Sequence, residues 1–78
     1  MINVDKFTRD FEAALEDVEP NSLSPLTRFR EEIESWDSLA ALSALAMLDS
    51  EYNVQITADE FLKCSTIQDV FELVSTRV

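Results

Sequence analysis

The chain has 78 residues, with 16 acidic and 6 basic side chains, no His, no Gly and a single Cys, and its formal net charge is −10. This length allows one domain, which we expect to span residues 1–78, and a hydrophobic content of 46% suffices for a small core. The absence of His excludes Ser–His nucleophilic pairs and most zinc sites, and a lone Cys excludes an intramolecular disulfide. The negative charge disfavours nucleic acid as a partner and favours proteins that present basic surfaces.

The chain start has neither a basic segment nor an uninterrupted apolar stretch of the kind found in signal peptides. The longest nearly apolar run, residues 39–48, is about half of the roughly 20 residues that a membrane-spanning helix needs. We therefore expect a cytoplasmic protein that does not bind membranes. We also expect it to be a monomer.

A first helix is predicted by apolar residues that recur at three- and four-residue steps from Val4 to Val18. The charged residues expected on its other face are Asp5, Lys6, Arg9, Asp10, Glu12 and Glu16. The segment from Pro20 to Pro25 ends this helix, because proline lacks a backbone N–H and is disfavoured inside a helix. The residues expected to face inward are Val4, Phe7, Phe11, Leu15 and Val18.

A long connection follows, over roughly residues 19–37. Its isolated apolar residues are Leu23, Leu26, Phe29, Ile33 and Trp36. Their spacing indicates a partly helical loop that packs on the core, with Trp36 as its main anchor, because a large aromatic side chain gains most from burial. Long ordered loops in small domains are often functional.

The second helix is predicted to begin at Asp37 or Ser38 and to run to about Glu51, with Asp37 as a favourable N-cap. Its spacing predicts a buried stripe made of Leu39, Leu42, Leu45 or Ala46, and Leu48.

Residues 52–56 form a short extended link that buries Val54 and Ile56 by alternation. A capping box of Thr57 and Glu60 then opens a short third helix that ends near Lys63. A last helix begins after Ser65 or Thr66 and turns Ile67, Val70, Phe71 and Val74 inward. The predicted fold class is therefore all-α: a four-helix bundle of three main helices and a short third helix, with a long loop between the first and second.

Asp37 and Ser38 lie where the long loop meets the second helix. By themselves they could simply cap that helix. The same position also suits a phosphate, because the first turn of a helix carries unpaired N–H groups and the positive end of the helix dipole.

The wider pattern resembles the acyl carrier protein family, from Phe7 to Val74. The resemblance rests on the register of several segments: Leu26-Thr27-Arg28-Phe29, Ser35 to Leu42 around Asp37-Ser38-Leu39, Asp49 to Ile56, and Thr66 to Val70. It implies that Ser38, flanked by Asp37 and Leu39, receives 4′-phosphopantetheine from coenzyme A through a separate phosphopantetheinyl transferase. The arm would hold acyl or aminoacyl groups as thioesters for fatty-acid, polyketide or more specialised biosynthesis.

The implied protein is a carrier rather than an enzyme, and it is served by loading and processing enzymes such as a ligase, ketosynthase, acyltransferase or thioesterase. The partner-binding residues expected from this resemblance are Asp37, Leu39, Leu42, Met47, Asp49 and Glu51. Met47 and the leucines could equally line the core or an acyl chain.

Two features depart from the family pattern. Ser35 stands where the family commonly has Gly. The second helix also has few acids, which favours partners that make more apolar contacts, unless its alanines only supply helix propensity.

Other residues point to structural roles. We expect Cys64 to be a half-buried packing residue, and the acid pairs Glu31-Glu32 and Asp59-Glu60 to be solvated rather than metal ligands. An unmodified helical interaction module is the alternative function, and an enzyme is a distant third because Ser38 lacks a base.

Overall fold

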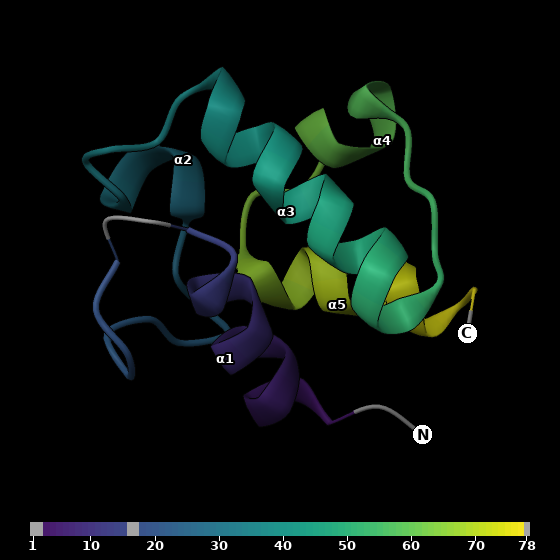
Figure 1. Cartoon of the computed structure of the whole chain (residues 1–78), viewed down its shortest axis with the longest axis horizontal. Coiled ribbons are helices and arrows are strands. Elements are labelled where there is room, and N and C mark those ends of the chain that lie inside the picture. The colour runs from purple at the N-terminus through teal and green to yellow at the C-terminus, as the bar shows by residue number, and fades with distance from the viewer. Residues whose placement is uncertain (1–2, 16–17, 78) are drawn as a thin grey trace.

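The computed structural model describes residues 3–15 and 18–77, and over these residues the protein is helical with no strand. The helices are α1 (Val4–Ala13), α2 (Phe29–Glu32), α3 (Ser38–Tyr52), α4 (Ala58–Leu62) and α5 (Ile67–Ser75). α1, α3 and α5 form the body, α2 lies within the long loop on one side, and the short α4 lies on the other (Figure 1). The predicted all-α class is confirmed, and the single turn of α2 is the helical part of the loop.

α1 is shorter than its apolar pattern predicts. Asn3 caps its start by accepting the N–H groups of Asp5 and Lys6, and the helix ends at Ala13 rather than near Val18. Leu15 is nevertheless buried and Val18 is partly buried, because the chain keeps packing on the core after the helix ends. Periodicity alone could not show this boundary. Glu16, expected on the polar face, lies outside the described residues.

The predicted buried stripe of α3 is wrong in part. Leu39 and Leu42 are 70% and 62% exposed, whereas Ala44, Met47 and Leu48 are buried. The reason is that residues 38–48 carry no charged side chain, so the helix is nearly apolar around its whole circumference and periodicity cannot select the inward face. The predicted N-cap of α3, Asp37, is confirmed. The helix ends at Tyr52, one residue beyond the predicted end, and the left-handed Asn53 caps it.

The C-terminal part of the chain follows the sequence prediction closely. Val54 and Ile56 are buried in the extended link. α4 begins with the capping box of Thr57 and Glu60. A second capping box, in which Thr66 is the N-cap, opens α5. The predicted inward face of α5 is buried, except that Phe71 is only partly covered.

Hydrogen bonds fix the long loop at both of its sides. Glu12, expected on the charged face of α1, is instead buried, because its carboxylate accepts the N–H groups of Asn21 and Leu23 at 3.1 and 2.7 Å. Arg9 donates to the Leu23 carbonyl. Further along, the carbonyls of Pro25 and Thr27 accept the first N–H groups of α5. The loop is therefore an ordered part of the fold.

α1 and α3 are tied by a polar contact at the far end of α3. The Tyr52 hydroxyl donates to Asp10 at 2.6 Å, and Lys6 donates to the same carboxylate at 2.8 Å. Partial burial acts to raise the pKa of Asp10, but these two hydrogen bonds outweigh it and hold that pKa below its ordinary value. Tyr52 also packs on Phe7, with 5.4 Å between ring centroids.

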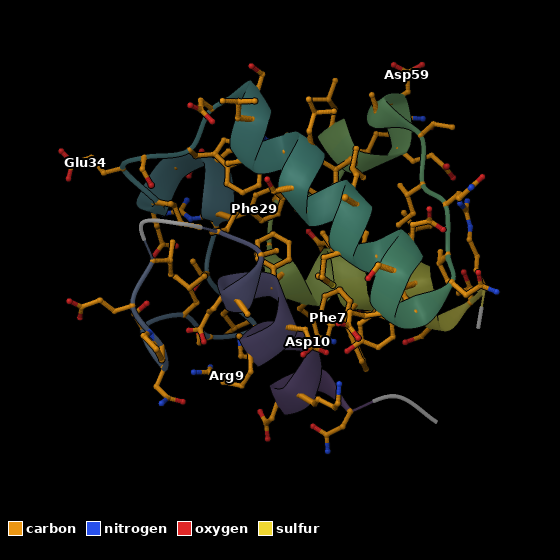
Figure 2. The ribbon with its side chains drawn as sticks, viewed as in Figure 1. Phe7, Arg9, Asp10, Phe29, Glu34 and Asp59 are labelled. Carbon is orange, nitrogen blue, oxygen red and sulfur yellow. The ribbon has the colours of Figure 1, made fainter. Side chains whose placement is uncertain are left out.

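An aromatic cluster joins the loop to the helices. It consists of Phe11, Phe29, Trp36 and Phe61, with ring centroids 4.8–6.1 Å apart. The prediction that Trp36 anchors the loop is confirmed. Figure 2 shows Phe29 directed into the body of the molecule, while Glu34 on the loop and Asp59 on α4 point away from it.

Substitution of Phe29 by Ala should cost about 3–5 kcal/mol of unfolding free energy, because it leaves a cavity in the middle of this cluster. The matched control is Leu26→Ala, since Leu26 lies in the same loop but is 75% exposed, and it should change stability by about 0.5 kcal/mol or less. Urea unfolding measures both. Equal effects for the two variants would contradict the anchoring role of the cluster.

The ion pair between Arg77 and Glu60 should give a pH-dependent difference in stability. The hydrogen bond from Arg77 lowers the pKa of Glu60 from 4.5 to about 2, so the stabilisation is complete above pH 4.5 and is lost as the pH falls toward 2. Arg77→Gln should therefore lower Tm at pH 7. The difference in Tm between this variant and the natural protein should become smaller as the pH falls from 4.5 to 2. Thermal melts followed by circular dichroism test this, and a gap that widens on acidification would contradict it.

Candidate functional site

Asp37 and Ser38 stand at the junction of the long loop and α3. Asp37 lies outside the helix, and its Oδ1 accepts the N–H of Ala40 at 2.9 Å. Ser38 is the first helical residue, and its side chain is exposed. The hydroxyl of Ser38 is thus presented at the start of a 15-residue helix.

The residues before this junction hold it in place. Ile33 is buried, its carbonyl accepts the N–H of Trp36 at 3.1 Å, and the Trp36 ring packs against Phe29 at 4.8 Å between centroids. The chain then leaves the core at Asp37, so that Asp37 and Ser38 emerge on the surface. The position of the serine is fixed by packing two residues upstream.

No side-chain hydrogen bond to Ser38 occurs among the described residues, and both arginines of the long loop have other partners. Arg28 pairs with Glu31 and Glu32, and the guanidinium of Arg30 donates to carbonyls at the end of α4. Ser38 therefore lacks the adjacent base that an activated nucleophile needs.

The site fits a covalently attached phosphate. A phosphoester on Ser38 would lie in the first turn of α3, where backbone N–H groups and the helix dipole favour negative charge. The side chain of Ser38 is exposed to solvent.

The surface beside Ser38 is apolar and hollowed. Leu39 and Leu42 are the exposed large apolar side chains of the first two turns of α3. A hollow of about 210 Å³ lies on one side, between the end of α1, the loop and α3. A wider groove of about 570 Å³ lies between α3 and the link before α4. The groove is lined by Leu42, Leu45, Ala46, Asp49, Gln55, Ile56 and Thr57.

The structure brings together only some of the residues predicted to bind partners. Asp37, Leu39 and Leu42 share the N-terminal part of α3 with Ser38, whereas the exposed Asp49 and Glu51 lie near its other end, about 16 Å away for eleven residues of helix. Met47 needs correction: it is only 8% exposed, because the side of α3 that carries it faces the core. It is a core residue and not part of the exposed surface.

Two features at the end of α4 could not be predicted from the sequence. Leu62 at the end of α4 is 63% exposed, and Arg30 bridges the loop to α4. An apolar residue at the last position of a short helix gives no sign of its exposure, and an arginine in a loop gives no sign of distant carbonyl partners. Neither had a local signal.

The remaining candidates have structural roles. Cys64 is buried more fully than expected, and this burial raises the pKa of its thiol. Glu31 pairs with Arg28, and Glu60 pairs with Arg77 and caps α4. Within residues 3–15 and 18–77 there is no group of three or more His, Cys, Asp or Glu side chains that could hold a metal ion. No helix in the same part of the chain is long and apolar enough to cross a membrane.

Comparison with known proteins agrees with this geometry. The family described as "Phosphopantetheine attachment site" matches residues 9–74. An acyl carrier protein of Thermosynechococcus vestitus (strain NIES-2133 / IAM M-273 / BP-1) is 31% identical over 61 residues, which are 78% of this chain and 74% of that protein. No solved structure matches the chain significantly. The chain therefore belongs to the acyl carrier protein family of phosphopantetheine attachment domains, and its cofactor is covalently attached 4′-phosphopantetheine.

Proposed function

We propose that this protein is an acyl or aminoacyl carrier that bears its phosphopantetheine on Ser38. The observation that carries the proposal is the exposed Ser38 hydroxyl at the first residue of α3, directly after the Asp37 N-cap and inside the matched region. Asp37 and Leu39 flank the attachment point, one fixing the start of the helix and the other exposed beside it.

The proposed attachment needs no catalysis from this chain. The Ser38 oxygen forms a bond to the phosphorus nearest the pantetheine in coenzyme A, and the pyrophosphate P–O bond breaks. Adenosine 3′,5′-bisphosphate leaves, and a base of the phosphopantetheinyl transferase takes the hydroxyl proton. Among the residues that the structure describes, no basic group is in hydrogen-bond contact with Ser38, so in this proposal the chain acts as the substrate of the transferase and not as an enzyme.

When bound, the group supplies a terminal thiol that holds acyl cargo as a thioester. The chain itself presents Ser38, keeps the start of α3 rigid, and offers a surface to the enzymes that load and process cargo. We propose a ligase, ketosynthase, acyltransferase or thioesterase as those partners, in fatty-acid, polyketide or more specialised biosynthesis. A monomer working in the cytoplasm is part of the same proposal.

Intact-mass measurement tests the attachment. Incubation with coenzyme A and a promiscuous phosphopantetheinyl transferase should add one phosphopantetheine to the natural protein and to Ser43→Ala, and none to Ser38→Ala. Ser43 is the matched control because it is another exposed serine of α3. No mass gain in a folded natural protein would favour the unmodified interaction module instead.

We also propose that partner enzymes dock on the exposed part of α3 through an apolar patch. Leu39 and Leu42 are exposed, and residues 38–48 offer no charge to a partner in a chain with 28% charged residues. Asp37 and Asp49 carry charge only at the two ends of this surface. A partner surface complementary to this part of α3 would be uncharged and apolar, with polar contacts at its rim.

The KM of the transferase for the unmodified protein tests this docking surface. Leu42→Ala should raise KM roughly five- to tenfold, as expected when an interface side chain worth more than 1 kcal/mol is truncated, whereas Asp49→Asn should change it little. Salt between 50 and 500 mM should have a weak effect, because apolar contacts are not screened. A steep salt dependence that Asp49→Asn and Glu51→Gln abolish would contradict an apolar docking surface.

A further inference from the structure

We propose that this carrier presents its cargo outside the helical bundle, because Phe61 closes the space beneath α4 and two arginines tie α4 at both ends. The inference rests on the proposed carrier function and specifies its cargo: short or polar acyl and aminoacyl groups that need no apolar shelter.

Phe61 fills the space that faces inward from α4. It is the buried residue of that helix, with 3% of its surface exposed. Its ring centroid lies 5.3 Å from that of Phe29 and 6.1 Å from that of Trp36, onto which it stacks. Both of these rings also pack on Phe11 of α1. Aromatic rings therefore occupy the interior between α4, the loop and α1.

The start of α4 is tied to the C-terminal end of the chain. Arg77 pairs with Glu60 and donates to the carbonyl of Gln55 at 3.3 Å. Glu60 also accepts the N–H of Thr57 in the capping box. The link before α4 and the first turn of α4 are thus held to the segment that follows α5.

The end of α4 is tied to the long loop. The Arg30 guanidinium donates to the carbonyls of Phe61 and Leu62 at 3.3 and 3.1 Å, and also to that of Cys64. The carbonyls lie at the end of α4 and just after it, where helical acceptors run out of backbone partners, although that of Phe61 also accepts the N–H of Cys64 at 3.0 Å. Arg30 therefore joins α2, which contains it, to the end of α4.

Entry of an alkyl chain beneath α4 would displace Phe61 from its ring contacts and break the ties of Arg30 or Arg77. The alternative resting places on the surface offer little shelter. The hollow of about 210 Å³ beside Ser38 is lined in part by the polar residues Ser35, Asp37 and Ser43. The groove along α3 includes Leu42, which is 62% exposed. A long alkyl group on this carrier would stay largely in water, which is unfavourable in proportion to its apolar area. Short or polar groups carry no such cost.

The experiment compares the natural protein loaded with acetyl-phosphopantetheine and with octanoyl-phosphopantetheine, each transferred from the matching acyl-coenzyme A. The two readouts are Tm and the emission of Trp36, the one tryptophan of the sequence. We expect the two loaded forms to have the same Tm and the same emission maximum. A Tm higher by about 4–8 °C for the octanoyl form, with a shifted Trp36 emission, would overturn the inference.

Phe61→Ala provides the converse test, because it should open a cavity beside Trp36. In this variant the octanoyl form should melt above the acetyl form, whereas Leu62→Ala, the exposed neighbour on α4, should show no such difference. If Phe61→Ala does not fold, Phe61→Leu replaces it as the cavity-forming variant in the same comparison. A cavity variant that gains no stability from octanoyl would contradict the role of Phe61. Failure of any loading, seen by intact mass, would instead contradict attachment at Ser38.

Discussion

The contact between Phe29 and Trp36 is the interaction on which the arrangement of this molecule depends. Their ring centroids are 4.8 Å apart, and through Phe11 and Phe61 they join α1 and α4 to a loop with little regular structure of its own. Ordering such a loop costs conformational entropy, which burial of these rings offsets. Because Trp36 immediately precedes Asp37, the same packing determines where α3 begins and where Ser38 reaches the surface.

The chemistry of the molecule is divided between its body and α3. Acidic residues are spread over α1, the loop and the C-terminal part, and several of them fix structure: Glu12 holds the loop, Asp10 binds Tyr52, and Glu60 and Asp69 cap helices. The first three turns of α3 carry no charge. A protein that is acidic overall thus has an uncharged surface next to its exposed serine.

Local signals in the sequence predicted local structure well. The caps at Asp37, Thr57 and Thr66, the buried alternation of Val54 and Ile56, and the anchoring of the loop by Trp36 all follow from neighbouring residues. The inward face of α3 could not be predicted from neighbouring residues, because an apolar helix without charges can bury either side. In the folded protein Ala44, Met47 and Leu48 are buried, whereas Leu39 and Leu42 are exposed.

Contacts between residues that are far apart in the chain could likewise not be predicted from the sequence. Arg30 reaches carbonyls more than thirty positions away, and nothing near it in the chain indicates those partners. The place of Ser38 at the start of α3 was predictable, since Asp37 directly before it is a favourable N-cap, whereas its role as the attachment residue was inferred from the family resemblance.

The most direct test of this account is to locate the phosphopantetheine on the modified natural protein by peptide fragmentation. Trypsin should release residues 31–63 as one peptide, which contains Ser35, Ser38, Ser43 and Ser50. Fragment ions on either side of each serine then assign the added mass. The account predicts that all of the added mass lies on Ser38; added mass on any other residue would contradict it.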